Sequence, residues 1–108
     1  MAKIRSLVVK DMNNCIFCGR PREHVHHAFG GRNRSASTKY HLLIPLCAEH
    51  HDMSNNSVHL NHDMDIQVKA MAQLAFENKY GHKKFMEVIG KNYREEQNEQ
   101  SNRDGSLD

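Results

Sequence analysis

The sequence predicts a small α+β domain in which a β-hairpin and a short helix precede two C-terminal helices. Two segments of β-compatible residues flank a polar stretch that begins with two glycines, which is the pattern of a hairpin. Apolar residues recur at helical spacing over residues 63–80, between an asparagine and a glycine. Two closely spaced pairs of cysteine and histidine bracket the hairpin, as in domains that a metal ion holds together.

The composition describes one small domain with a thin apolar core. The chain has 108 residues, only 38% of them hydrophobic, and no tryptophan. Such a chain buries little apolar surface unaided, so a structural metal would add needed stability. The N-terminus lacks a sustained apolar segment, and no stretch reaches membrane-spanning length. We therefore expect a cytoplasmic protein that does not bind membranes.

The hairpin strands are expected at residues 23–29 and 40–46. Pro45 lacks a backbone N–H, which favours a short strand or an edge strand there. Residues 32–38 show no burial pattern and are expected to form a polar loop. A short helix is expected to begin after the second strand, over residues 47–53.

A serine- and asparagine-rich loop at residues 54–59 leads to the strongest helix prediction, at residues 63–80. Asn61 can cap this helix and Gly81 ends it. Its apolar stripe is expected to contain Met64, Val68, Met71, Leu74 and Ala75. A second helix, at residues 82–92, is expected to add Phe85, Val88 and Ile89 to the same core.

These expectations divide the chain into four parts. Residues 1–14 form an N-terminal arm or a short strand, and residues 15–60 form the metal-bound core. Residues 61–93 form the helices that pack on it. Apolar residues become rare in residues 94–108, so this tail is expected to be disordered.

The spacing of four residues indicates a structural zinc site. Cys15 and Cys18 lie in a tight turn, and Cys47 and His50 follow after 28 intervening residues, which a hairpin can occupy. Three cysteines cannot all pair internally, and in a reducing compartment this pattern favours zinc over a disulfide. His51 is also within one helical turn of Cys47, but the two-residue spacing favours His50 as the ligand.

Basic residues outnumber acidic residues over most of the chain but not at its C-terminal end. Residues 1–93 carry thirteen Lys and Arg against eight Asp and Glu, whereas residues 94–108 carry two against five. A local positive excess suits a polyanion such as nucleic acid, although a solvated basic loop has the same composition. Arg32, Arg34 and Lys39 could bind phosphates, which would give affinity without sequence choice.

The order of the motifs resembles the zinc-bearing HNH endonucleases over residues 15–59. Cys-x-x-Cys is followed by His-His at the end of a strand and by Leu-Cys-x-x-His-His at the start of a helix. The resemblance implies a ββα-metal core, a treble-clef-like hairpin and helix. It further implies that His26 and His51 bind a catalytic metal and that His27 is the general base. The C-terminal half is similar to small HNH proteins of phages and prophages, which implies phage DNA processing, with replication or recombination proteins as partners, in the bacterial cytoplasm.

One position departs from the family pattern. The family's middle asparagine, which orients the base, has no counterpart shortly before Cys47. Four residues could take its role: His41, Asn33, Asn55 and Asn56. We place His41 beside His27 among the catalytic candidates. His59 is either a third ligand of the catalytic metal or a loop histidine.

The chemistry of these residues agrees with phosphodiester hydrolysis. The reaction needs a base for the attacking water, and neutral imidazole titrates close to physiological pH. It also needs a cation, here Mg²⁺, Mn²⁺, Ni²⁺ or Zn²⁺, and imidazole ligands disfavour magnesium. The sequence thus predicts a metal-dependent DNA endonuclease with one catalytic metal and low sequence specificity. The alternatives are a zinc-stabilised DNA-binding or adaptor module without catalysis, and a structural zinc protein that binds another protein.

Overall fold

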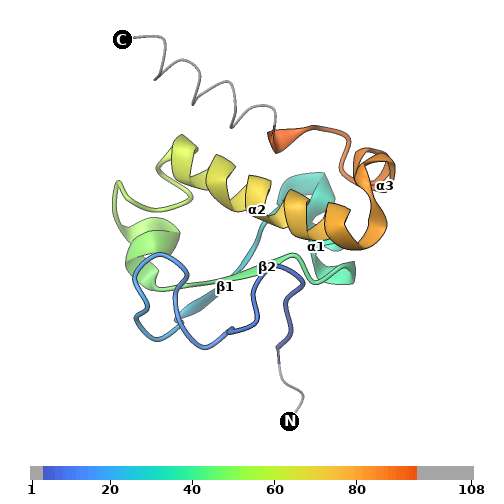
Figure 1. The fold of residues 1–108 in the computed structure, drawn as a ribbon. Coiled ribbons are helices and arrows are strands. Elements are labelled where there is room, and N and C mark those ends of the chain that lie inside the picture. The colour runs from blue at the N-terminus through green and yellow to red at the C-terminus, as the bar shows by residue number, and fades with distance from the viewer. Residues whose placement is uncertain (1–3, 95–108) are drawn as a thin grey trace, which may run out of the picture.

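The computed structural model describes residues 4–94 and is an α+β fold (Figure 1). Two strands form an antiparallel sheet, and helical segments follow each of them. The elements are β1 (His24–His27), the 3-10 turn η1 (Gly31–Asn33), α1 (Arg34–Lys39), β2 (Leu43–Leu46), the π-helical turn η2 (Glu49–Met53), α2 (His62–Tyr80) and α3 (His82–Val88). Within the described range, no helix combines the length and apolarity needed to cross a bilayer.

The hairpin is present but shorter than predicted. Each strand has four residues, and His26 pairs with Ile44 while His27 pairs with Leu43. The second strand starts late because His41 adopts a left-handed backbone with φ of 58°, which ends the preceding turn. Pro45 fits within β2 because both strands of a two-stranded sheet are edge strands.

The segment between the strands is helical, so the prediction of a polar loop at residues 32–38 was wrong. It forms η1 and α1, and its one buried residue is Ser37. The Ser37 hydroxyl donates to the Phe29 carbonyl at 2.8 Å and accepts from the Phe29 N–H at 3.0 Å. This polar contact with the strand end holds the short helix without an apolar stripe, which is why hydrophobic periodicity did not detect it.

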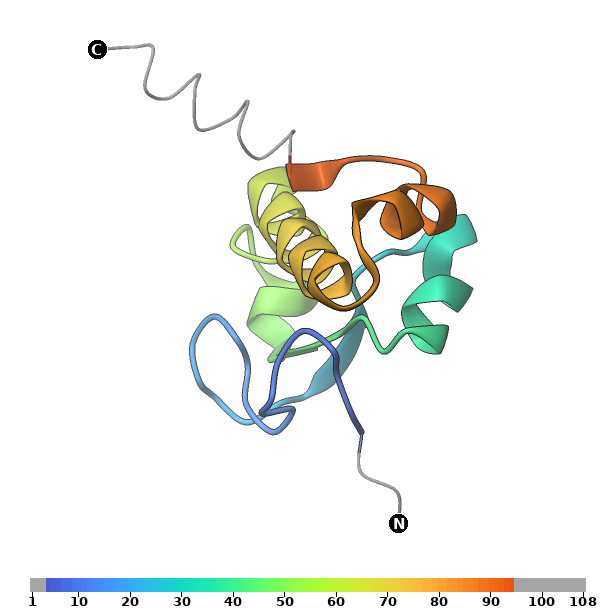
Figure 2. The same ribbon diagram turned by 45° about the vertical axis from the view of Figure 1, so that its right-hand side comes forward.

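Helix α2 begins and ends close to the predicted residues. The Asn61 side chain accepts from the N–H groups of Asp63 and Met64, as the capping prediction required, and Gly81 follows the last turn. Figures 1 and 2 show α2 crossing above the hairpin, with α3 packed beside its C-terminal end.

The predicted apolar stripe of α2 was only partly right. Val68 is fully buried, but Met71 and Leu74 are 41% and 44% exposed. The buried face contains Ile66, Val68, Ala70, Ala72, Gln73 and Phe76. Aromatic packing selects this face: the Phe76 ring lies 5.0 Å from Tyr40 and 5.6 Å from Phe85 between centroids. The helix predicted at residues 82–92 ends at Val88, but the predicted burial of Phe85 and of Ile89, which follows the helix, is confirmed, and Val88 is partly buried against the same core.

The N-terminal arm runs beside β2 without forming a strand at residues 4–9. Its contacts are a hydrogen bond of 2.7 Å from the Ser6 hydroxyl to the Leu43 carbonyl and one of 2.8 Å from the Leu7 N–H to the His41 carbonyl. Of the predicted tail, Arg94 is described and donates to Glu77 at 3.0 Å, whereas residues 95–108 lie outside the described range.

A buried amide fixes the chain after α3 against α2. Gln73 is fully buried, and its side-chain oxygen accepts from the N–H groups of Tyr93 and Arg94 at 2.8 and 3.2 Å. Its amide nitrogen donates to Glu77 and to Asn92 at 2.9 Å each. All hydrogen-bonding groups of the amide are therefore satisfied, so its burial costs little free energy.

The two faces of α2 differ in their predicted contribution to stability. Phe76→Ala should lower the free energy of unfolding by about 3–5 kcal/mol, because it leaves a cavity among aromatic rings. Leu74→Ala, on the exposed face, should change it by about 0.5 kcal/mol or less. Urea denaturation of the metal-loaded proteins measures both. Equal losses would mean that Leu74 is as buried as Phe76, which would contradict the exposed face described above.

Candidate metal centre and adjoining cavity

A tight turn after the N-terminal arm brings the first two cysteines together. The Gly19 N–H donates to the Cys15 carbonyl at 2.9 Å, and Gly19 adopts a φ of 76° that few other residues tolerate. The Cys15 N–H donates to the Arg20 carbonyl at 2.8 Å and closes the turn. The Ile16 N–H donates to the Pro45 carbonyl at 3.1 Å. This hydrogen bond holds the turn against the end of β2, next to Cys47.

The predicted zinc ligands Cys15, Cys18, Cys47 and His50 converge, with one donor atom from each within 4.8 Å of the others. The sulfurs of Cys18 and Cys47 lie 3.7 Å apart, and His50 Nδ1 lies 3.6 and 3.2 Å from the sulfurs of Cys15 and Cys47. A tetrahedral zinc ion would set about 3.8 Å between two sulfurs and about 3.6 Å between sulfur and nitrogen. The four donors could therefore bind a metal ion such as zinc.

The pKa values of the two buried cysteines shift in opposite directions. Burial raises the pKa of the Cys15 thiol, but hydrogen bonds from the backbone N–H groups of Cys47 and Phe17 outweigh it and lower this pKa to about 7. Burial raises the pKa of the Cys47 thiol above its usual range. A bound cation would offset the repulsion between the crowded thiolates and favour their ionised form.

The turn after β2 differs from the predicted α-helix at residues 47–53. It is a π-helical turn over Glu49–Met53, preceded by one helical residue. The following loop folds back on it: the Val58 N–H donates to the His50 carbonyl at 2.8 Å, and the His59 N–H donates to the His51 carbonyl at 3.2 Å. This backbone pairing places the His59 ring beside the His51 ring, with 4.6 Å between centroids.

His26, His51 and His59 form a second cluster, with one ring nitrogen from each within 4.8 Å of the others. The Nε2 atoms of His51 and His59 lie 3.1 Å apart, close to the separation of about 3.3 Å that two imidazoles adopt on one tetrahedral zinc ion. His26 is 8% exposed, and its Nε2 is buried without a hydrogen-bond partner. An unpartnered buried nitrogen is costly unless it binds a ligand, so this cluster could also hold a metal ion.

Burial favours the neutral form of His26 and of His51. It is the main reason that the pKa of His26 falls to about 3, and the neighbouring His51 and His59 lower it further. Burial also lowers the pKa of His51, again with His59 contributing. A neutral imidazole presents a lone pair, which is the form that binds metals.

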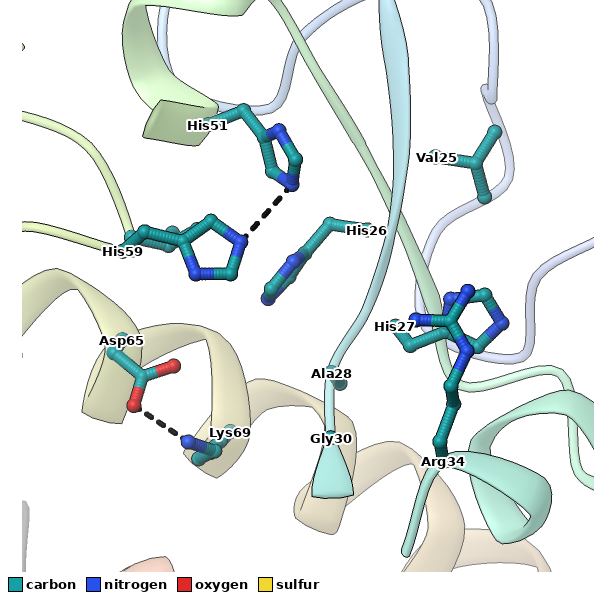
Figure 3. Close-up of a pocket in the computed structure, with 11 residues that line it drawn as sticks. Val25, His26, His27, Ala28, Gly30, Arg34, His51, His59, Asp65 and Lys69 are labelled. Carbon is teal, nitrogen blue, oxygen red and sulfur yellow. Dashed lines mark hydrogen bonds and ion pairs between the residues drawn. The ribbon is translucent and has the colours of Figure 1, made fainter. Parts of the chain in front are cut away.

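The second cluster opens into a cavity of about 430 Å³. Figure 3 shows His26, His51 and His59 converging on one side of β1, and His27 on the other side with Arg34 over it. This split follows from the alternation of side chains along a strand. Both adjacent histidines nevertheless line the cavity, as do Asp65 and Lys69 from α2.

Thr38 is the partner of His27, and sequence reasoning missed it. The Thr38 hydroxyl lies 3.1 Å from His27 Nε2 and donates to the Arg34 carbonyl at 3.2 Å. A hydroxyl that donates to this carbonyl can only accept from His27, and in that arrangement the ring proton is on Nε2 and Nδ1 is the proton acceptor. Burial, and then the charge of Arg34, lower the pKa of His27, which favours this neutral form.

The other residues proposed to orient the base have different positions. His41 is exposed at the turn before β2 and is not among the residues that line the cavity. The Asn33 amide donates to the Ile89 carbonyl at 3.3 Å. Asn55 and Asn56 are exposed in the loop after η2. Of the three basic residues proposed to bind phosphate, Arg34 lines the cavity, whereas Arg32 and Lys39 are exposed on neighbouring turns of the same segment.

His24 and Asp52 lie on the outer side of His51. The His24 ring stacks on the His51 ring with 4.7 Å between centroids, and Asp52 Oδ2 lies 3.7 Å from His51 Nδ1. This distance is too long for a hydrogen bond, and His51 Nδ1 is buried without a hydrogen-bond partner.

Comparisons of this chain with protein-family models, with curated proteins and with solved structures found no match.

The two clusters predict two metal ions per chain with unequal roles. Elemental analysis of the zinc-loaded protein should find two ions, and His26→Ala should retain one ion and cooperative unfolding, at a lower melting temperature because the second ion no longer binds the folded state. Cys47→Ala should lose the structural ion and cooperative unfolding, because a domain of this size depends on its metal. A single ion in the wild-type protein would contradict the second site.

Proposed function

We propose that this protein is a metal-dependent DNA endonuclease of the HNH type, with low sequence specificity. The observation that carries the proposal is the cluster of three imidazoles, including the buried and unpartnered His26 nitrogen, in a cavity that His27 and Arg34 also line. Metal ligands, a neutral imidazole base and a cation in one cavity are the groups that phosphodiester hydrolysis requires.

His27 is the general base in this proposal. Its Nδ1 takes a proton from the attacking water as the new oxygen–phosphorus bond forms. The bond from phosphorus to one ester oxygen breaks, and that oxygen receives a proton from solvent. The contact between Thr38 and Nε2 holds the ring in the tautomer that this transfer needs.

His26, His51 and His59 would hold the catalytic cation. A divalent ion there supplies Lewis acidity and offsets the charge that develops on the phosphate and the leaving oxygen. Three imidazoles favour manganese, nickel or zinc over magnesium, which prefers oxygen ligands. The Cys15, Cys18, Cys47 and His50 cluster would hold the structural zinc.

DNA contacts in this proposal involve the phosphate backbone. Arg34 lines the cavity beside His27, and the exposed Arg32 and Lys39 extend the positive charge along the same segment. Phosphate contacts give affinity and orientation without reading base sequence, which is why low specificity is proposed. A cytoplasmic role in phage DNA processing, beside replication or recombination proteins, belongs to the same proposal.

The order of the elements is compatible with the HNH proposal. A hairpin supplies His26 and His27, and the turn directly after β2 supplies His51, which is the order of a ββα-metal core. The π-helical turn η2 stands where that core has the start of its helix.

Plasmid nicking with added Mn²⁺, Ni²⁺, Mg²⁺ or Zn²⁺ tests the general base. His27→Ala should reduce the rate by about 100-fold or more, because general-base catalysis contributes that much. His41→Asn is the matched control, since asparagine tolerates the left-handed backbone, and it should nick at the wild-type rate. Wild-type rates for His27→Ala would remove the base assignment.

Two other outcomes would redirect the proposal. Loss of nicking in His41→Asn would identify His41 as the orienting residue. If no protein nicks with any metal, while DNA binding persists without sensitivity to His27, the binding or adaptor module becomes the better description.

A pair of substitutions tests the tautomer at His27. Thr38→Val removes the acceptor at nearly constant volume and should lower the nicking rate by about tenfold, with metal content unchanged. Thr38→Ser keeps the hydroxyl and should retain most of the rate. Single-turnover assays at saturating metal measure this difference. A rate in Thr38→Val equal to that in Thr38→Ser would show that the hydroxyl does not position the base.

A further inference from the structure

Helix α2 contributes two charged side chains to the same cavity, although the proposed nuclease core ends before this helix. Asp65 and Lys69 line the cavity with the histidines. Figure 3 shows them on the side of β1 that carries His26, opposite to the side with Arg34. The cavity therefore has a cation on each side of the strand.

Contacts on two sides hold the Lys69 ammonium group. It donates to Asp65 Oδ2 at 2.5 Å, one helical turn earlier. It also lies 5.6 Å from the centroid of the Tyr93 ring, within the range of a cation–π contact. Tyr93 is itself fixed, because its N–H donates to the buried Gln73 side chain at 2.8 Å. The segment after α3 thus helps to position a cavity-lining cation.

The environment of this pair differs from that of an ordinary surface pair. Ion pairs at this helical spacing are common on solvated helices, where both side chains are free to move. Here the side chains of Lys69 and Asp65 are only 20% and 22% exposed, and both residues line the cavity. An ammonium group has three N–H donors, and Asp65 accepts from one. Donors therefore remain for a ligand in the cavity.

We propose that Lys69 is a phosphate-binding residue of this cavity and that Asp65 is its positioning residue. The identity of the ligand as a DNA phosphate rests on the proposed function. Lys69 contacts the backbone on the metal side of β1 while Arg34 contacts it on the side of the general base. The phosphate that undergoes hydrolysis is then held from both sides, and α2 belongs to the DNA-binding face.

DNA binding tests the inference separately from cleavage. The His27→Ala protein, loaded with Mn²⁺, is titrated with a labelled 20-base-pair duplex at salt concentrations from 50 to 200 mM. Adding Lys69→Gln should weaken binding by about tenfold and reduce the slope of log K against log salt by about 0.9, the value for one lost phosphate contact. Lys69→Arg should restore both. Lys79→Gln removes the same charge near the C-terminal end of α2, outside the cavity lining, and should change neither.

The outcomes separate this inference from the nuclease proposal. An unchanged slope and affinity in Lys69→Gln would overturn the role of Lys69, whatever the nicking assay shows. If Lys69→Gln reduces the slope but the wild-type protein never nicks DNA, Lys69 still lies on a DNA-binding face and the nuclease proposal is rejected. Thermal melting checks the fold of each variant, and Lys69→Met, which keeps the apolar stem, replaces Lys69→Gln if that protein is unfolded.

Discussion

The π-helical turn after β2 is the constraint on which both candidate metal clusters depend. Its consecutive residues His50 and His51 face different ligand sets, one with three cysteine sulfurs and the other with two further histidines. The loop that follows pairs its backbone with the carbonyls of these same residues and so places His59. Anything that shifts this turn would move a ligand in both clusters at once. The stability of the fold and the geometry of the proposed catalytic site therefore depend on the same turn.

The short hairpin separates the roles of two adjacent histidines. Strand alternation directs His26 toward His51 and His59, and His27 toward Thr38 and Arg34. His26 is deeply buried and His27 only partly so, which suits a metal ligand in one case and a proton acceptor in the other. Strand β2 leads directly into Cys47, so the cluster that could bind a metal ion adjoins the end of the short sheet.

Polar networks supplement an apolar core that is small for the chain. Glu77 accepts from Gln73, His82 and Arg94, and although burial raises its pKa, these hydrogen bonds outweigh burial and hold the pKa below its usual value. With Gln73 it ties the chain after α3 to α2. Buried networks of this kind stabilise a fold when every member has a partner. In this protein the same network also reaches the cavity through Tyr93 and Lys69.

The sequence by itself determined the features that depend on local spacing. The cysteine and histidine pairs, the hairpin, the Asn61 cap and the ends of α2 follow from short-range patterns, because their chemistry involves residues close in the chain. Only the tertiary structure decided which face of α2 is buried. Met71 and Leu74 are as apolar as residues of the buried face, and the aromatic partners of that face, Tyr40 and Phe85, come from distant segments. It likewise decided that Thr38 meets His27 and that Lys69 reaches the cavity. Those contacts join elements whose relative positions no local pattern encodes.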